Sequence, residues 1–166
     1  MIAAAVLLGF SVLPSSQAVA QSESQESYVV FYIGATSCNP CNRPEVIKAV
    51  KEIESDFSDV HDEIPAKYVM VAMDKEIDKG ISFLKKYGSF WDEVSVGSFY
   101  YNEHVLRYLN SQEPPGVPHV FVFRDTYQDA MHGVDTVEDR TMVKRVMGGE
   151  GIVAWVNDGF PLNSTS

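Results

Sequence analysis

Three continuous apolar runs stand out in a chain whose hydrophobic and polar residues are otherwise mixed. They are residues 28–33 (YVVFYI), 68–73 (YVMVAM) and 117–123 (VPHVFVF), and all three are rich in β-branched and aromatic side chains. Apolar runs of this length are typical of strands that are buried on both faces of a sheet. Residues 91–96 and 141–147 are weaker strand candidates.

Between these runs, apolar residues recur at helical spacing. Val46, Val50, Ile53 and Phe57 lie three or four residues apart, with lysine and glutamate between them. This spacing predicts an amphipathic helix, which we expect to begin near Cys38. Shorter helices are expected over residues 78–87, 102–109 and 150–157. In the first of these, Ile81 and Leu84 are expected to face the core, with Phe83 as a further candidate, and Gly88 ends the helix. Asn102 is expected to cap the second helix, and Gly148 and Gly149 precede the third.

The order of these predicted elements indicates the fold class. Strands alternate with helices along most of the chain, which predicts an α/β fold with a layered sheet. Residues 125–140 are polar and fit either a hairpin or a long loop. The tail over residues 159–166 is expected to be disordered.

Residues 1–20 are expected to be a secretory signal peptide. Residues 2–13 (IAAAVLLGFSVL) are apolar, and Ala18-Val19-Ala20 fits the pattern of a cleavage site, with the cut after Ala20. As a helix, the apolar run spans about 18 Å, well short of the roughly 30 Å hydrocarbon core of a membrane. We therefore expect a periplasmic or secreted protein without stable membrane insertion.

Composition and charge indicate how the mature chain is organised and which class of partner it does not bind. Residues 21–27 (QSESQES) are polar and fit a flexible leader, which leaves residues 28–158 as one domain with one core. The formal net charge is −10, from 13 basic and 23 acidic residues. Because phosphate binding requires a basic face, this charge argues against nucleic acid as a partner.

Cys38 and Cys41 are the only cysteines of the chain and lie in TSCNPC (residues 36–41). A bridge between them closes too small a loop to stabilise a domain of this size by restricting its unfolded chain. At a helix N-terminus, however, unpaired N–H groups and the helix dipole favour a reactive thiolate. We therefore expect Cys38 to be the nucleophile and Cys41 the resolving thiol, with Pro40 fitting the first helical turn.

The sequence VVFYIGATSCNPC, followed by an amphipathic helix, resembles the thioredoxin superfamily. GVPHVFVF (residues 116–123) is similar to the strand entry that carries the family's cis-proline. The resemblance covers roughly residues 28–158, and the extra helix and weak strand around residues 78–97 resemble the insertion of TlpA-type extracytoplasmic thioredoxins. It implies a thioredoxin-like fold, with a central mixed sheet flanked by helices and with the insertion between the CxxC helix and the cis-proline strand.

The resemblance also implies an activity, a thiol–disulfide exchange carried by Cys38 and Cys41. Pro118 is then the cis-proline, and Val117 before it pairs with the backbone of the client, like an added strand. The implied partners are proteins with thiols or disulfides and, in an oxidising compartment, a membrane electron donor. No cofactor and no metal are implied.

This chain departs from the family pattern at several positions. Ser37 replaces the usual tryptophan before the first cysteine, Pro44 comes earlier after Cys41 than is usual, and the buried acid of the preceding strand is absent. Asp74 or Glu76 could instead accept the proton of Cys41, or both could be exposed acids at the start of a helix. His119 could tune the Cys38 thiolate, or it could be an edge residue that points to solvent.

Three functions therefore remain open from the sequence. The first is an extracytoplasmic thiol–disulfide oxidoreductase that acts as a reductase on a narrow set of client proteins. The second is a Cu(I)-binding protein that uses Cys38, Cys41 and His119, with Met131-His132 as a further ligand source. The third is a non-catalytic thioredoxin-like binding module in which the cysteine pair is a relic.

Overall fold

The computed structural model describes residues 25–88, 91–97, 102–109, 116–128 and 136–162. The predicted signal peptide, residues 1–20, lies outside this part of the chain. None of the helices in the described residues has the length and apolar character needed to cross a membrane.

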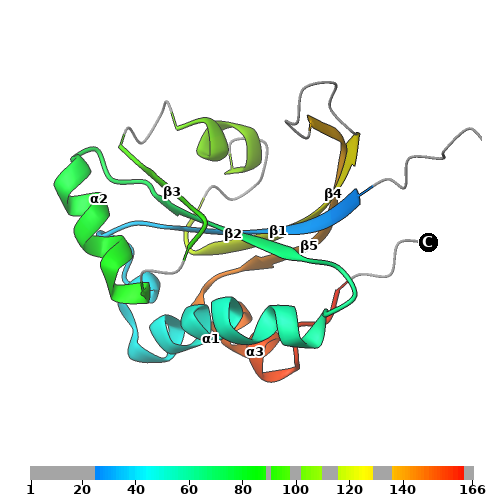
Figure 1. Cartoon of the computed structure of the whole chain (residues 1–166). Coiled ribbons are helices and arrows are strands. Elements are labelled where there is room, and N and C mark those ends of the chain that lie inside the picture. The colour runs from blue at the N-terminus through cyan, green and yellow to red at the C-terminus, as the bar shows by residue number, and fades with distance from the viewer. Residues whose placement is uncertain (1–24, 89–90, 98–101, 110–115, 129–135, 163–166) are drawn as a thin grey trace, which may run out of the picture.

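A mixed sheet of five strands forms the centre of the described fold (Figure 1). The strands are β1 (Gln25–Gly34), β2 (Ala66–Ala72), β3 (Glu93–Val96), β4 (His119–Gln128) and β5 (Thr136–Met147). Their order across the sheet is β3-β2-β1-β4-β5. β1, β2 and β3 run parallel, whereas β4 is antiparallel to both β1 and β5. The sequence correctly predicts an α/β fold with a mixed sheet.

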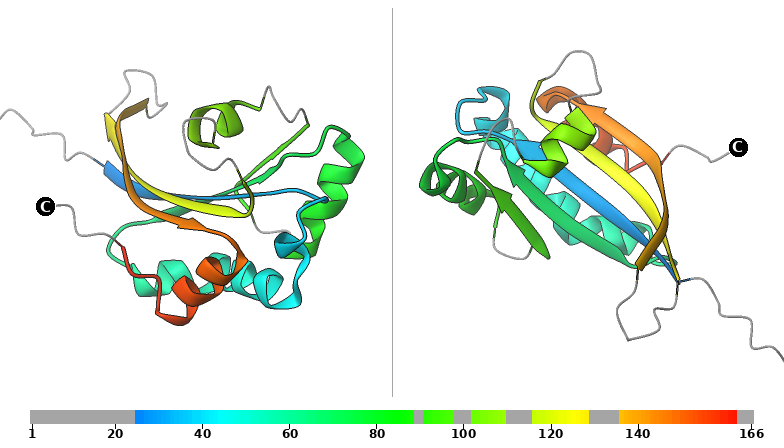
Figure 2. Two further views of the ribbon diagram at one scale, coloured as in Figure 1. Left: turned by 180° about the vertical axis from the view of Figure 1, so that it is seen from behind. Right: turned by 90° about the horizontal axis from the view of Figure 1, so that it is seen from above.

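Helices cover both faces of this sheet. α1 (Pro44–Val60) and α3 (Gly149–Asn157) lie against one face, and a π-helical segment, η3 (Val105–Leu109), lies against the other (Figure 1, Figure 2). α2 (Ile77–Leu84) continues into a 3-10 turn, η2 (Lys85–Tyr87), and lies beside the end of the sheet where β1 leads into the cysteine motif (Figure 1). α2 and β3 are the predicted insertion between the cysteine helix and β4.

The alternation of side chains along the strands divides the core into two clusters. Val30 and Tyr32 of β1 point to the face that α1 and α3 cover, and the two cysteines belong to the same cluster. Phe31 and Ile33 point to the other face, where η3 packs. Because β1 is central and is covered on both faces, it carries a continuous apolar run. On α1, Val46, Val50, Ile53 and Phe57 are all buried, which confirms the predicted amphipathic helix.

Two strands are longer than the sequence pattern predicts. β1 begins at Gln25, which pairs with Tyr127, so three residues of the predicted leader belong to the sheet. β5 begins at Thr136, and β4 and β5 pair antiparallel, which fits the hairpin rather than the long loop. These extensions are half polar because they lie at the edge of the core, where apolar runs no longer mark a strand.

The structure corrects the expected start of the cysteine helix. Residues Pro40–Asn42 form a short 3-10 turn, Arg43 is extended with φ −72° and ψ 136°, and α1 begins only at Pro44. A residue that precedes proline is driven out of the helical region by contact with the proline ring, while proline itself suits the first helical position. The early proline therefore separates the cysteine motif from α1.

The expected disorder after Gly159 is wrong for the first residues of the tail. Phe160 is buried and packs its ring against Phe57 and Trp155, with ring centroids 5.8 Å and 5.3 Å apart. The indole N–H of Trp155 donates to the carbonyl of Pro161 at 3.1 Å. This short segment closes the end of the core between α1 and α3, and residues 163–166 lie outside the described part of the chain.

If Phe160 anchors the tail, Phe160→Ala should lower the free energy of unfolding by about 3 kcal/mol, as is typical when a buried aromatic side chain is removed. Chemical denaturation followed by circular dichroism measures this change. Val60→Ala is the matched control, because Val60 is half exposed at the end of α1 and should cost about 0.5 kcal/mol or less. A loss for Phe160→Ala no larger than that of the control would show that the tail does not pack.

Candidate active site

The two cysteines lie just beyond the buried end of the central strand and form a disulfide. Their Cα atoms are 5.2 Å apart. Cys38 keeps 7% of its surface exposed, whereas Cys41 has none, and the neighbouring Ser37 and Asn39 are exposed. Cys38 is therefore the more exposed residue of the pair, which fits the predicted order of attack and resolution.

The sulfur of Cys38 lies between two groups from distant parts of the sequence. The backbone N–H of Cys41 donates to Cys38 Sγ at 3.1 Å, and the carbonyl oxygen of Val117 lies 3.3 Å from the same sulfur. The peptide bond between Val117 and Pro118 is cis. The carbonyl of Pro118 is held in turn by the N–H of Gly148, at the start of α3, at 2.9 Å. The fold thus brings the two motifs recognised in the sequence into contact.

Side chains, rather than a continuous helix, hold the backbone around Cys38. The Asn42 side-chain amide donates to the carbonyls of Thr36 and Cys38, at 3.0 Å and 2.7 Å. Lys86 Nζ, from η2, donates to Asn42 Oδ1 at 2.7 Å. Sequence reasoning missed Asn42 and Lys86, because a polar residue after a CxxC motif gives no signal of its own.

The two candidate proton acceptors lie in different environments. Asp74 accepts hydrogen bonds from the backbone N–H of Thr36, at 3.1 Å and 3.3 Å, so its carboxylate holds the loop before Cys38. Glu76 is exposed and pairs with Lys79 at 2.6 Å, as expected of an acid at the start of a helix. Among the described residues, no hydrogen bond joins a carboxylate to either sulfur.

Two buried tyrosines lie beneath Cys41, and sequence reasoning missed both. Tyr87 donates its hydroxyl to the carbonyl of Cys41 at 2.6 Å, and the hydroxyls of Tyr32 and Tyr87 are 2.7 Å apart. Burial raises the pKa of Tyr87 to about 12, and burial together with Tyr87 raises the pKa of Tyr32 well above its usual range. One signal was present in the sequence, since a hydroxyl in a run that is buried on both faces requires a partner.

His119 lies within the core, on the side of the sheet away from the cysteines. It is fully buried and stacks on Phe121, a member of the cluster beneath η3. An Arg145 side-chain nitrogen lies 3.2 Å from His119 Nε2. Since guanidinium can only donate, Nε2 accepts and the neutral ring carries its proton on Nδ1. The alternative of a solvent-facing edge residue is therefore wrong.

The ligand set of the copper hypothesis is not assembled. The described residues contain no group of three or more His, Cys, Asp or Glu side chains that could hold a metal ion. His119 is separated from Cys38 and Cys41 by the sheet, and Met131-His132 lies outside the described residues. Of the proposed ligands that the structure describes, only the two cysteines lie together.

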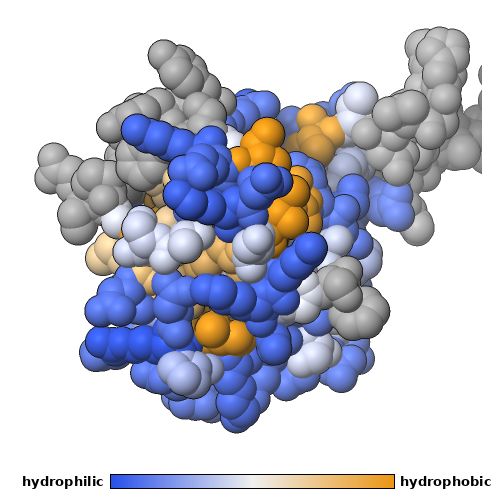
Figure 3. All heavy atoms as spheres, turned by 90° about the vertical axis from the view of Figure 1, so that its left-hand side faces the viewer, coloured by the Kyte–Doolittle hydropathy of each residue, from blue (hydrophilic) through white to orange (hydrophobic). Residues whose placement is uncertain are grey.

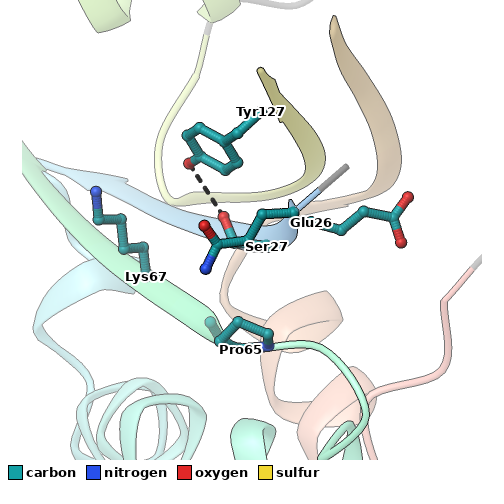
Figure 4. A pocket seen from close by; sticks show the side chains of 7 residues that line it. Glu26, Ser27, Pro65, Lys67 and Tyr127 are labelled. Atoms are coloured by element: carbon teal, nitrogen blue, oxygen red, sulfur yellow. Dashed lines mark hydrogen bonds between the residues drawn. The ribbon is translucent and has the colours of Figure 1, made fainter. Parts of the chain in front are cut away.

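A pocket of about 380 Å³ lies at the other end of β1 (Figure 4). Glu26, Ser27, Pro65, Lys67 and Tyr127 are among the residues that line it, and the Ser27 hydroxyl donates to Tyr127 at 3.1 Å (Figure 4). The cysteines follow the opposite end of this ten-residue strand, roughly 30 Å away at the rise of an extended chain. The pocket is therefore separate from the cysteine site.

Comparisons with known proteins find similar solved structures but no matching sequence family. No protein-family model and no curated protein sequence matches the chain. Among solved structures, the chain is similar to the thioredoxin domain of a thiol-disulfide oxidoreductase from Bacteroides vulgatus, with 15% identity, a TM-score of 0.47, and coverage of 81% of this chain and 80% of that one.

Two further solved structures are similar to a comparable degree. A thioredoxin-like protein from Porphyromonas gingivalis has 21% identity and a TM-score of 0.41 over 80% of this chain and 74% of that one. ScoI from Arabidopsis thaliana, solved with copper bound, has 16% identity and a TM-score of 0.41 over 80% of this chain and 81% of that one. At such scores the similarity carries no argument about activity or metal. The chain's own strand order and directions show a thioredoxin-like fold.

The burial of His119 predicts a dependence of stability on pH. Burial lowers the pKa of His119 from its usual 6.5; the backbone of Gly116 opposes this in part, and the charge of Arg145 adds a smaller lowering of the pKa. The unfolded chain therefore takes up the proton first as the pH falls. The stability that the neutral imidazole provides is complete above about pH 6.5 and is lost as the pH falls through the lower, folded-state pKa.

We expect the free energy of unfolding to be smaller at about pH 5.5 than at about pH 7.5, by up to about 1.4 kcal/mol for each pH unit below 6.5. His119→Asn, which cannot titrate, should lose most of this difference. Denaturant titrations at the two pH values measure it. Equal pH dependence in the variant and the wild type would assign the effect to other groups.

Proposed function

We propose that this protein is a thiol–disulfide oxidoreductase that acts outside the cytoplasm, as a reductase with a narrow set of client proteins. One observation carries the proposal: the sulfur of Cys38, the more exposed cysteine of the pair, lies 3.3 Å from the carbonyl of Val117, directly before the cis-proline. A structural bridge does not need a free backbone carbonyl from another strand beside its exposed sulfur. A site that must align an incoming disulfide does.

The first step is attack on the client. The thiolate of Cys38 attacks one sulfur of the client disulfide, and the client S–S bond breaks as the mixed disulfide forms. The departing client sulfur leaves as a thiolate and takes a proton from water. The N–H of Cys41, which points at Cys38 Sγ, favours the thiolate that this step requires.

The second step is resolution. Cys41 loses its proton, and its thiolate attacks Cys38 Sγ, which expels the second client sulfur and closes the Cys38–Cys41 disulfide. Two electrons and two protons have then passed from the dithiol to the client. A dithiol donor, supplied from the membrane in an oxidising compartment, returns the pair to the reduced form by the same exchange in reverse.

Val117 and Pro118 form the docking element for the client. Val117 precedes β4 and is partly exposed, so its backbone can pair with an extended segment of the client. The Val117 carbonyl lies 3.3 Å from the sulfur of Cys38, next to the place where the client disulfide would be attacked. Ser37, which stands where the family usually has tryptophan, and Asn39 are exposed on either side of Cys38 in the sequence and favour a specialised client.

The role of the cysteines can be tested with insulin as a defined disulfide substrate. The wild type should accelerate the reduction of insulin by dithiothreitol, and Cys41→Ser should form a mixed disulfide on Cys38 that dithiothreitol releases. Mass spectrometry and non-reducing electrophoresis detect this species. Cys38→Ser is the matched control and should trap nothing, because Cys41 is fully buried. If Cys41→Ser traps no more insulin chain than Cys38→Ser, the pair is not a catalytic dithiol.

Export gives a second test. In a bacterial host with a periplasm, the mature protein should begin at Gln21 and appear in the periplasmic fraction, because Ala18 and Ala20 supply the small residues of the cleavage site. Intact-mass measurement reads the N-terminus directly. Replacing both alanines with leucine should block the cut while leaving the apolar run unchanged. An uncut wild-type chain in the cytosol would contradict the proposed location.

A further inference from the structure

The carbonyl of Cys41 cannot obtain the hydrogen bond that a continuous helix would give it. In an α-helix it would accept from the N–H four residues later, but the extended Arg43 and the start of α1 at Pro44 break that register. Among the described residues, no backbone N–H bonds to this carbonyl. A buried carbonyl without a donor is costly, so a side chain has to supply one.

Tyr87 supplies this donor from η2, 46 residues away in the sequence. Its hydroxyl donates to the Cys41 carbonyl at 2.6 Å, a short bond in a buried site. A tyrosine hydroxyl carries one proton, and that of Tyr87 is used here. In the 2.7 Å contact between the two hydroxyls, Tyr32 must therefore be the donor. The result is a directed chain from Tyr32 to Tyr87 to the backbone of Cys41.

The surroundings leave room for these hydroxyls and fix their rings. A Cβ atom placed on Gly34 would lie 2.9 Å from the Tyr32 hydroxyl and 2.8 Å from the Phe83 ring, so a larger residue there would collide with the chain. The rings of Tyr32 and Tyr87 lie with centroids 4.9 Å apart, and Phe83 contacts Tyr87 at 5.2 Å. Both tyrosines are fully buried, so water does not compete for their bonds.

We propose that Tyr87, backed by Tyr32, is the positioning residue of the resolving cysteine: it fixes the Cys41 peptide so that the sulfur of Cys41 stays aimed at Cys38 throughout the exchange. This proposal rests on the proposed function. It explains how a chain with an early proline after its CxxC motif keeps a rigid second thiol. Removing the Tyr87 hydroxyl takes away the hydrogen bond that holds the Cys41 carbonyl, which α1 does not supply. The Cys41 peptide is then less well fixed, and the resolving step becomes slower.

The tyrosines act as donors and not as the base that deprotonates Cys41. Burial raises the pKa of Tyr87 to about 12 and that of Tyr32 well above its usual range, so both stay protonated at neutral pH. Tyr32 lies in the strand segment where the thioredoxin resemblance lacks its buried acid. This segment therefore carries a hydroxyl that donates to Tyr87, which in turn donates to the Cys41 backbone, in place of a proton acceptor for the thiol.

The two steps can be timed separately with 5,5′-dithiobis(2-nitrobenzoate) added in equal amount to the reduced protein. Attack by Cys38 releases one coloured thiolate, and resolution by Cys41 releases the second. For Tyr87→Phe we expect a first phase within about twofold of the wild type and a second phase about tenfold slower. For Tyr32→Phe the second phase should slow by about threefold, because Tyr87 still donates to Cys41.

Tyr68→Phe is the matched control. Tyr68 is also buried, and its hydroxyl forms a 2.6 Å hydrogen bond with the hydroxyl of Ser58. Ser58 belongs to α1, so this bond does not involve Cys41. Both phases of this variant should match the wild type, whatever its loss in stability. If Tyr68→Phe slows the second phase as much as Tyr87→Phe does, the effect is one of general stability and the proposal is overturned.

The pH profile of the second phase separates positioning from proton transfer. If Tyr87 positions Cys41, its loss lowers the rate at every pH and leaves the midpoint of the profile in place. A wild-type rate in Tyr87→Phe, or a midpoint moved by about one pH unit or more, would overturn the proposal. Failure of the proposed function gives a different result from failure of this proposal. If the second phase is slow in Tyr87→Phe but Cys41→Ser traps no insulin, Tyr87 positions Cys41 in a dithiol that serves another purpose than reducing client proteins.

Discussion

The antiparallel register between β1 and β4 is the constraint on which the site depends. Ile33, at the buried end of β1, lies opposite His119, the first residue of β4. The chain that leaves β1 and the chain that enters β4 therefore meet at one end of the sheet, and Cys38 Sγ comes to lie beside the carbonyl of Val117. A slip of two residues would move the two motifs apart by roughly 7 Å, and a slip of one would exchange the side chains that face the two halves of the core. The buried aromatic and β-branched residues on both faces of these strands fix the register.

Around this meeting point, polar groups are satisfied by side chains from outside the motif. Asn42 holds the carbonyl of Cys38, Tyr87 holds that of Cys41, and Asp74 holds the N–H of Thr36. This arrangement follows from Pro44, which ends the hydrogen bonding between the motif and α1. The partners are Asn42, directly after the motif, Asp74, just beyond β2, and Tyr87 of η2, so the segments before and after α2 support the site. Figure 3 views the side of the molecule that carries α2, where hydrophilic residues surround small hydrophobic areas.

The sequence predicts much of this architecture because its strongest signals are local. Continuous apolar runs identify β1, β2 and β4, helical spacing identifies α1, and Asn102 accepts hydrogen bonds from the next turn as the predicted cap. The two motifs identify the cysteine pair and its neighbour across the sheet. Partners that depend on tertiary structure could not be predicted: Tyr32 and Tyr87 are 55 residues apart, and the face on which His119 lies depends on the register of β4. The break before Pro44 had a local signal, but the helical spacing of Val46 and Val50 is the same whether the helix starts at Cys38 or at Pro44.

The midpoint potential of the Cys38–Cys41 couple tests the central claim, that this pair is a working dithiol, most directly. Equilibration of the protein with glutathione or dithiothreitol buffers, followed by counting of free thiols, measures it. The account predicts a reversible two-electron couple between about −270 and −120 mV, the range of thioredoxin-like oxidoreductases. A potential below about −300 mV, as is typical of a structural disulfide, would contradict it.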